Sequence, residues 1–238
     1  MDTDVLAKAL LDRIRGGLVV SCQPDSYDRA GDPMNAPAIM AALAQAAQLG
    51  GAVGIRADGP EDIAAVAEAV SLPVIGLFKA DLPGFEVRIT PTLEHARRVA
   101  QAGAQGIAVD ATRRPRPEGG SAAEYIRRVR DETGRPVFAD VSVLDEGLAA
   151  AEAGADALLT TLSGYTAYSP QQDGPDLALI EALAARSGLP VIAEGRINTP
   201  ELAARALDCG AWAVTVGSAI TRPRWITRRF VDELRGRA

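Results

Sequence analysis

The segment Pro73-Val-Ile-Gly-Leu-Phe-Lys79 sets the pattern that the rest of the chain repeats. Its apolar run predicts a buried strand, and the turn-forming residues Asp81-Leu-Pro83 end that run. The strand closes on Lys79, one of only two lysines among 25 basic residues. A desolvated lysine can lose its proton and act as a base, whereas arginine stays protonated. Lys79 is therefore a candidate catalytic residue, and a structural ion pair with Asp81 is the alternative.

The same unit, a short apolar strand followed by an amphipathic helix, recurs along the chain. Glycine-containing turns such as Ala102-Gly-Ala104 separate each helix from the next strand. Continuous apolar strands that alternate with helices indicate a parallel sheet covered by helices. Strands are expected at 18–23, 52–58, 73–79, 106–111, 136–141, 157–162, 190–195 and 213–218, and helices at 3–15, 37–48, 60–70, 93–102, 121–132, 143–153, 176–187, 199–208 and 224–235.

Eight strand–helix units in 238 residues predict a (β/α)8 TIM barrel. No linker divides the chain, so 1–238 is expected to form a single domain, in which 1–16 is a helix that precedes the first strand. The main competitor is a doubly wound open sheet, which would usually carry a Gly-rich phosphate loop after its first strand. Here that strand ends in Ser21-Cys-Gln-Pro24, and a loop is expected over 24–37.

Composition narrows the class of protein. Hydrophobic residues make up 47% and charged residues 24%, and the net charge of −6 gives no reason to expect a nucleic-acid or membrane surface. No apolar run reaches the roughly 18 residues of a membrane-spanning helix, and the start lacks the basic residues of a signal peptide. Two cysteines and one histidine suit neither a disulfide framework nor a metal cluster. We expect a cytoplasmic protein.

Polar side chains stand at almost every strand end. Active sites of this barrel lie at the carboxyl ends of the strands, where so many confined charges would be costly unless paired. The alternative is a ring of structural ion pairs, for example Arg56 with Asp58. The strand-end residues are Gln23, Arg56, Lys79, Asp110, Asp140, Thr160 or Thr161, Glu194 and Ser218.

The last two strands carry a second signal. Gly195 follows strand seven and Gly217-Ser218 follows strand eight, and turns at these two places often bind phosphate in such barrels. Arg222 would add a bidentate cation. We expect Arg196 to be an ion-pair residue or loop anchor. The basic loop Arg113-Arg-Pro-Arg-Pro117 is expected to be solvated or in a subunit contact, and the alternative is that it brings positive charge to the mouth.

These features indicate a barrel enzyme that acts on a small phosphorylated substrate. Lys79 could form a Schiff base with a carbonyl, as in an aldolase, or could remove a proton next to a carbonyl with help from a carboxylate. Another sugar-phosphate isomerase, or a barrel that only senses a sugar phosphate, also remains possible. No redox-cofactor motif and no metal-ligand cluster is visible in the sequence.

Read together, the strand-end motifs resemble the N-acetylmannosamine-6-phosphate 2-epimerase family from about residue 17 to 230. The resemblance rests on the following motifs: Ser21-Cys-Gln-Pro24, Gly54-Ile-Arg-Ala-Asp-Gly59, Pro73 to Lys79, Ile89-Thr-Pro-Thr92, Ala139-Asp-Val-Ser142, Thr160-Thr-Leu-Ser-Gly-Tyr-Thr166, Ala193-Glu-Gly-Arg-Ile197 and Val216-Gly-Ser-Ala-Ile-Thr-Arg-Pro223. Phe78 and Ala80-Asp-Leu82 depart from the usual pattern, which bears on how the sugar is held.

The resemblance implies a homodimeric barrel enzyme of sialic-acid breakdown. It would interconvert N-acetylmannosamine 6-phosphate and N-acetylglucosamine 6-phosphate through an enolate, without a metal or organic cofactor. The resemblance gives Lys79 the acid–base role and places Glu194 beside the reacting carbon, where it returns a proton or holds a hydroxyl that relays one. By the same resemblance, substrate-binding positions are Gln23, Arg56, Asp140 and Thr161, and the phosphate site is Gly195, Gly217, Ser218 and Arg222.

Overall fold

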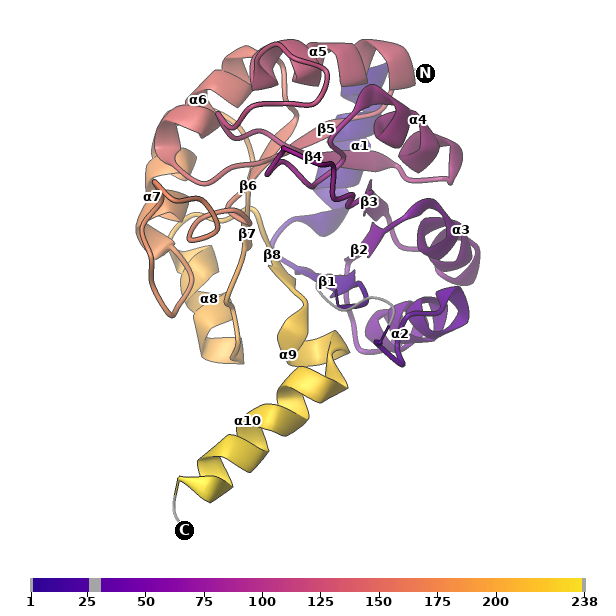
Figure 1. Cartoon of the computed structure of the whole chain (residues 1–238), viewed down its shortest axis with the longest axis vertical. Coiled ribbons are helices and arrows are strands. Elements are labelled where there is room, and N and C mark those ends of the chain that lie inside the picture. The colour runs from indigo at the N-terminus through magenta and orange to yellow at the C-terminus, as the bar shows by residue number, and fades with distance from the viewer. Residues whose placement is uncertain (1, 26–30, 237–238) are drawn as a thin grey trace.

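Eight parallel strands close into a barrel in the computed structural model, which describes residues 2–25 and 31–236 (Figure 1). Each strand pairs with the next along the chain, and β8 pairs with β1. The strands are β1 (Leu18–Cys22), β2 (Gly54–Asp58), β3 (Val74–Leu77), β4 (Gly106–Asp110), β5 (Val137–Asp140), β6 (Ala157–Leu159), β7 (Val191–Glu194) and β8 (Ala213–Val216). The predicted TIM barrel is confirmed, while the predicted loop 24–37 lies partly outside the described residues.

Helices connect the strands and cover the outside of the barrel. They are α1 (Thr3–Ile14), α2 (Pro37–Leu49), α3 (Pro60–Ala69), α4 (Leu93–Gln101), α5 (Ala122–Thr133), α6 (Leu144–Glu152), α7 (Leu177–Arg186), α8 (Pro200–Asp208), the short α9 (Ser218–Thr221) and α10 (Pro223–Arg235). Local sequence fixes several ends. Ser121 and Glu124 form a capping box at the start of α5, and Gly134 ends that helix in the left-handed region at φ 59°. Among the described residues, no helix is long and apolar enough to cross a membrane.

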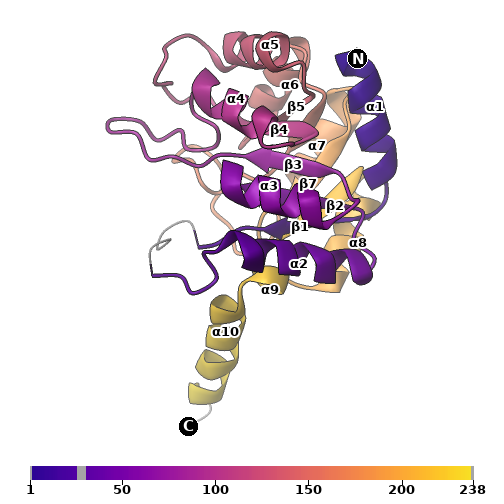
Figure 2. The ribbon, with the colours of Figure 1, turned by 90° about the vertical axis from the view of Figure 1, so that its right-hand side faces the viewer.

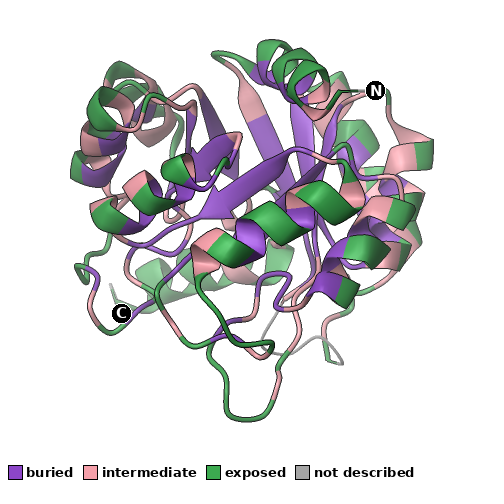
Figure 3. Cartoon of the chain, turned by 90° about the horizontal axis from the view of Figure 1, so that it is seen from above, coloured by how far each residue is buried: buried purple, intermediate pink, exposed green. Residues whose placement is uncertain are grey.

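The inside of the barrel is apolar at its lower end, where α1 closes it. Leu10 and Ile14 of α1 are buried in one cluster with Val19 and Phe138 of the strands. Figure 3 shows the strands as a buried centre, while the surrounding helices expose their outer faces. Side chains alternate along a strand, so the residue two positions after an interior apolar residue also points inward.

Along each of several strands, the inward-facing side chains change from apolar in the interior to polar at the mouth of the barrel. Val19 is followed two residues later by Ser21, Phe138 by Asp140, and Ile192 by Glu194. Ala108 and Ala213, which also lie in the interior cluster, precede Asp110 and Thr215 in the same way. The polar residues therefore gather at one end of the barrel because of strand geometry, without any special local motif.

Three strands end two or more residues earlier than the sequence predicts. The third strand ends at Leu77, and Lys79 forms an isolated antiparallel bridge with Ile89. The sixth ends at Leu159, two residues before Thr161, and Ser218 begins α9 instead of closing the eighth strand. The predicted strands included 78–79, 160–162 and 217–218, which lie past the last strand residue. In the structure these residues belong to the loops that form the mouth.

Helix α10 leaves the barrel. Figures 1 and 2 show it projecting beyond α9, and none of its described residues is buried. Phe230 and Leu234, four residues apart and therefore on one face, are each 69% exposed. This apolar face has no partner within the described part of the chain.

We expect Gly106→Ala to lower the free energy of unfolding by about 1–3 kcal/mol, as overpacking of a core does. A Cβ on Gly106 would stand 2.5 Å from Cε2 of Phe138, inside the barrel. Urea denaturation of both proteins measures the difference. Gly174→Ala is the matched control, because its Cβ would meet no heavy atom within 4 Å. An unchanged denaturation midpoint for Gly106→Ala would contradict this account of the interior.

Candidate active site

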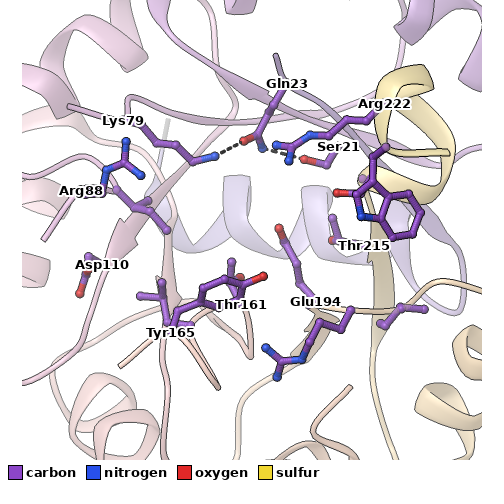
Figure 4. A pocket seen from close by; sticks show the side chains of 18 of the residues that line it. Ser21, Gln23, Lys79, Arg88, Asp110, Thr161, Tyr165, Glu194, Thr215 and Arg222 are labelled. Atoms are coloured by element: carbon purple, nitrogen blue, oxygen red, sulfur yellow. Dashed lines mark hydrogen bonds between the residues drawn. The ribbon is translucent and has the colours of Figure 1, made fainter. Parts of the chain in front are cut away.

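A cavity of about 420 Å³ opens at the carboxyl ends of the strands (Figure 4). Most of the predicted site residues line it, from five different strand ends. These are Gln23, Lys79, Thr161, Glu194, Gly195, Gly217, Ser218 and Arg222. Arg56 and Asp140 are not among the lining residues; they lie behind Thr161 and Glu194, to which Arg56 is hydrogen-bonded.

Lys79 points into this cavity from the loop after β3. Its backbone N–H donates to Oδ1 of Asp58 at 2.9 Å, which fixes the chain on which the side chain stands. Its Nζ donates to Oε1 of Gln23 at 2.6 Å, and Nε2 of Gln23 donates to the Oγ of Ser21 at 2.7 Å. The suggested pair of Lys79 with Asp81 does not form, since Asp81 pairs with Arg88.

Burial lowers the pKa of Lys79 below its ordinary value. The cations Arg56 and Arg222 lower this pKa further, while Asp58 and Glu194 oppose the change. Its direct side-chain contact is the neutral amide of Gln23, which does not stabilise the ammonium as a carboxylate would. The site therefore favours a lysine that can exist as the neutral base.

Arg56 lies under the floor of the cavity and holds two carboxylates. Its Nη2 donates to both oxygens of Asp140, at 2.9 and 2.8 Å, and its Nη1 donates to Glu194 and to Thr161. The side chains of Arg56 and Asp140 are 1% and 0% exposed. Through these hydrogen bonds the guanidinium joins β2 to β5, β7 and the loop after β6.

The charges in this cluster do not balance. One guanidinium stands between two carboxylates, and burial raises the pKa of Asp140 to about 6, with Glu194 adding to the rise and Arg56 opposing it. Burial alone would lower the pKa of Arg56, but Asp140 and Glu194 raise it above its ordinary value. Arg56 thus stays a cation and fixes the carboxylate of Glu194, which faces the cavity opposite Lys79 (Figure 4).

The residues of the predicted phosphate site lie at one end of the cavity, after β7 and β8. Gly195 has a φ of 109°, a conformation that favours glycine, and a Cβ on Gly217 would stand 3.2 Å from that of Ser21. The first N–H groups of α9, beginning at Ser218, have no partner within that helix. Arg222 lines the same end, so donors and a cation converge there. Arg196 is a loop anchor, because its Nε donates to the carbonyl oxygen of Gly174 at 2.8 Å.

At the opposite end of the cavity, sequence reasoning identified Asp110 but expected the arginines there to lie elsewhere. The expectation that 113–117 is a solvated or subunit-contact loop was wrong for two of its arginines, because Arg114 lines the cavity and Arg116 is 4% exposed. The guanidinium of Arg116 lies 4.2 Å from the ring centroid of Tyr125. Arg88, from the loop after β3, lines the cavity as well. A loop sequence rich in arginine gave no sign of which side chains turn inward.

Within residues 2–25 and 31–236, no group of three or more His, Cys, Asp or Glu side chains is placed to hold a metal ion. The groups available for chemistry in the cavity are one lysine, a carboxylate fixed across from it, and a cluster of hydrogen-bond donors at each end.

Comparison with known proteins shows which family this chain resembles. A family model described as "Putative N-acetylmannosamine-6-phosphate epimerase" matches residues 40–236. A relative named "Putative N-acetylmannosamine-6-phosphate 2-epimerase" from Cutibacterium acnes is 51% identical over 95% of this chain and 97% of its own. One of the same name from Caldanaerobacter subterraneus subsp. tengcongensis is 48% identical over 96% and 95%.

A solved structure agrees with the sequence matches. The N-acetylmannosamine-6-phosphate 2-epimerase from Clostridium perfringens superimposes with a TM-score of 0.88 at 43% identity, over 93% of this chain and 95% of that one. The family model covers β2 to β8 and the loops after them, and the relatives and the solved structure each cover at least 93% of the chain. The chain therefore belongs to the N-acetylmannosamine-6-phosphate epimerase family, a family of isomerases.

Proposed function

We propose that this protein interconverts N-acetylmannosamine 6-phosphate and N-acetylglucosamine 6-phosphate, with Lys79 as the base. The observation that carries the proposal is the placement of Nζ of Lys79 in the cavity, 2.6 Å from a neutral amide oxygen and opposite a fixed carboxylate. A small substrate with a phosphate at one end suits this cavity, because Arg222 and the turns at Gly195 and Gly217 supply donors there.

The reaction begins on the open-chain sugar, whose aldehyde makes the proton on the neighbouring carbon acidic. Neutral Lys79 removes that proton from C2, and the electron pair of the C–H bond passes into an enolate. The resulting ammonium remains hydrogen-bonded to Gln23. Gln23 and Arg56 are the candidate donors for the enolate oxygen. Gln23 suits this role better, because it lines the cavity whereas Arg56 is occupied by Asp140, Glu194 and Thr161.

Reprotonation on the opposite face completes the change of configuration. Glu194 lies across the cavity from Lys79, so it either delivers the proton or holds a substrate hydroxyl that relays it from the lysine. Arg56 and Asp140 act through Glu194, as positioning residues that keep its carboxylate oriented. Both proton transfers use side chains and substrate, without a metal or organic cofactor. A place in sialic-acid breakdown and a cytoplasmic location stay predictions.

Lys79→Ala should reduce epimerisation by about 10²–10⁴-fold, the usual effect of removing a general base. Lys79→Arg should be nearly as damaging, because arginine does not become neutral. Proton NMR of N-acetylmannosamine 6-phosphate in deuterated water follows exchange at C2 and formation of the epimer together. Lys8→Ala is the control, since Lys8 is the other lysine and lies exposed on α1 beside Asp12. Normal exchange at C2 by Lys79→Ala would refute the proposal.

The same measurement on Glu194→Gln separates the two routes for the returning proton. If Glu194 delivers it, this variant should still exchange the C2 proton through Lys79 but should form no epimer. If Glu194 only holds a hydroxyl, the amide of the variant can still accept a hydrogen bond from that hydroxyl, so epimer should still form at a reduced rate.

Gln23→Glu should move the rising limb of the kcat/KM profile to higher pH by about one unit or more. The base acts when neutral, so kcat/KM rises as pH passes the pKa of Lys79, which burial holds below 10.5. A carboxylate 2.6 Å from Nζ would stabilise the ammonium and raise that pKa. Gln45→Glu, on the exposed face of α2, should leave the profile unchanged. An unmoved limb in Gln23→Glu would mean that Lys79 is not the titrating base.

We also propose that two chains form a homodimer through α10, because its apolar face is exposed in the single chain. Light scattering after gel filtration should give twice the chain mass of 24.8 kDa. Replacing both Phe230 and Leu234 by Glu should give the single-chain mass. Arg228→Glu, two residues from Phe230 and so on another side of the helix, should not. A single-chain mass for the unaltered protein would contradict the dimer.

A further inference from the structure

The cavity has a second cationic end, opposite the proposed phosphate site. Arg114 reaches it from the loop after β4, and Arg88 reaches it from the loop after β3. Figure 4 shows Arg88 and Asp110 on one side of the cavity and Arg222 on the other, with Lys79 and Glu194 between them. The proposed reaction gives no task to this end.

Arg114 is held rigidly at that end by its own loop. Its Nη2 donates to Oδ2 of Asp110 at 2.6 Å, and its Nε donates to Oγ1 of Thr112 at 3.0 Å. Thr112 is tied to the same carboxylate, because its backbone N–H and its hydroxyl both donate to Oδ1 of Asp110, at 2.9 and 2.6 Å. Asp110 is fully buried, and the Arg114 side chain is 11% exposed. The plane of the guanidinium is therefore set before any ligand binds.

One nitrogen of this guanidinium remains available. Nε and Nη2 are both engaged, whereas Nη1 has no hydrogen-bond partner in residues 2–25 and 31–236. Arg56 differs, because its Nη1 and Nη2 are both used by protein oxygens. Arg114 thus presents a fixed donor to the cavity.

The substrate proposed above has a group that would reach this donor. With its phosphate at Arg222 and its C2 between Lys79 and Glu194, the acylated nitrogen on C2 leads away from the phosphate, toward the end with Arg114. An acetamido group needs a donor for its carbonyl oxygen and an apolar surface for its methyl. Ile89 and Leu162 line the cavity together with Arg114 and supply that surface.

We propose that Arg114 is the residue that selects for an acyl group on the sugar nitrogen, by donating from Nη1 to the acyl carbonyl oxygen. This inference rests on the proposed function and adds to it the reason for preferring an N-acylated sugar phosphate over a plain one. Asp110 and Thr112 serve this role as positioning residues.

Two unreactive open-chain ligands test the inference. These are 2-acetamido-2-deoxyglucitol 6-phosphate and glucitol 6-phosphate, which differ only in the group on C2 and cannot be deprotonated there. Calorimetric titration of the unaltered protein should show tighter binding of the acetamido compound by about tenfold or more. Arg114→Met should abolish that preference and leave the affinity for glucitol 6-phosphate within about twofold of its original value. Arg113→Met, an exposed neighbour in the same loop, should retain it.

Arg114→Met removes the cation from buried Asp110, so a second variant guards against misfolding. Arg114→Lys keeps a cation for Asp110 but has no second nitrogen at the position of Nη1; it should show the same selective loss with a melting temperature close to that of the unaltered protein. Equal weakening of both ligands by folded Arg114→Lys, or an undiminished acetamido preference, would overturn the inference and leave the proposed function standing. If neither ligand binds the unaltered protein, the sugar-phosphate site fails, and the inference with it.

Discussion

The buried guanidinium of Arg56 is the interaction on which the mouth of the barrel depends. It binds Asp140 through both oxygens and also binds Glu194 and Thr161, so one side chain joins four segments of the chain. Removing one partner of a buried ion pair commonly costs about 3–5 kcal/mol, because the remaining charge is left without compensation. Arg56 thus holds the polar mouth together and keeps the carboxylate of Glu194 facing the cavity.

The charged side chains of the cavity are spread along its length. Arg222 and the glycine turns after β7 and β8 occupy one end, and Lys79 and Glu194 face each other in the middle. Asp110 lies at the far end and holds Arg114 there. Lys79 contacts the neutral amide of Gln23. Arg56 and Arg114, in contrast, are each paired with a buried carboxylate. This difference in partners suits a lysine that changes protonation and arginines that do not.

The barrel and most of its cavity were predictable because both follow from short-range rules. Alternating apolar strands and helices gave the (β/α)8 barrel, and reading the last residue of each strand gave Gln23, Lys79, Glu194 and the glycine turns that line the cavity. The predicted strand ends were less accurate, since apolar residues such as Phe78 continue past the last ladder hydrogen bond. The direction of α10 was not predictable, because its amphipathic sequence fits packing on the barrel as well as projection from it.

The sequence by itself determined which residue types reach the mouth, because side-chain alternation along a strand is a local property. Only the tertiary structure decided their partners. Arg56 pairs with residues 84 and 138 positions away, and Lys79 contacts Gln23, while Asp81 pairs with Arg88. Closure of the barrel brings the ends of distant strands to within hydrogen-bonding distance. It also places Arg114, in a loop that was expected to be solvated, at the wall of the cavity. Such pairings depend on the ring of eight strands as a whole, and no local stretch of sequence contains them.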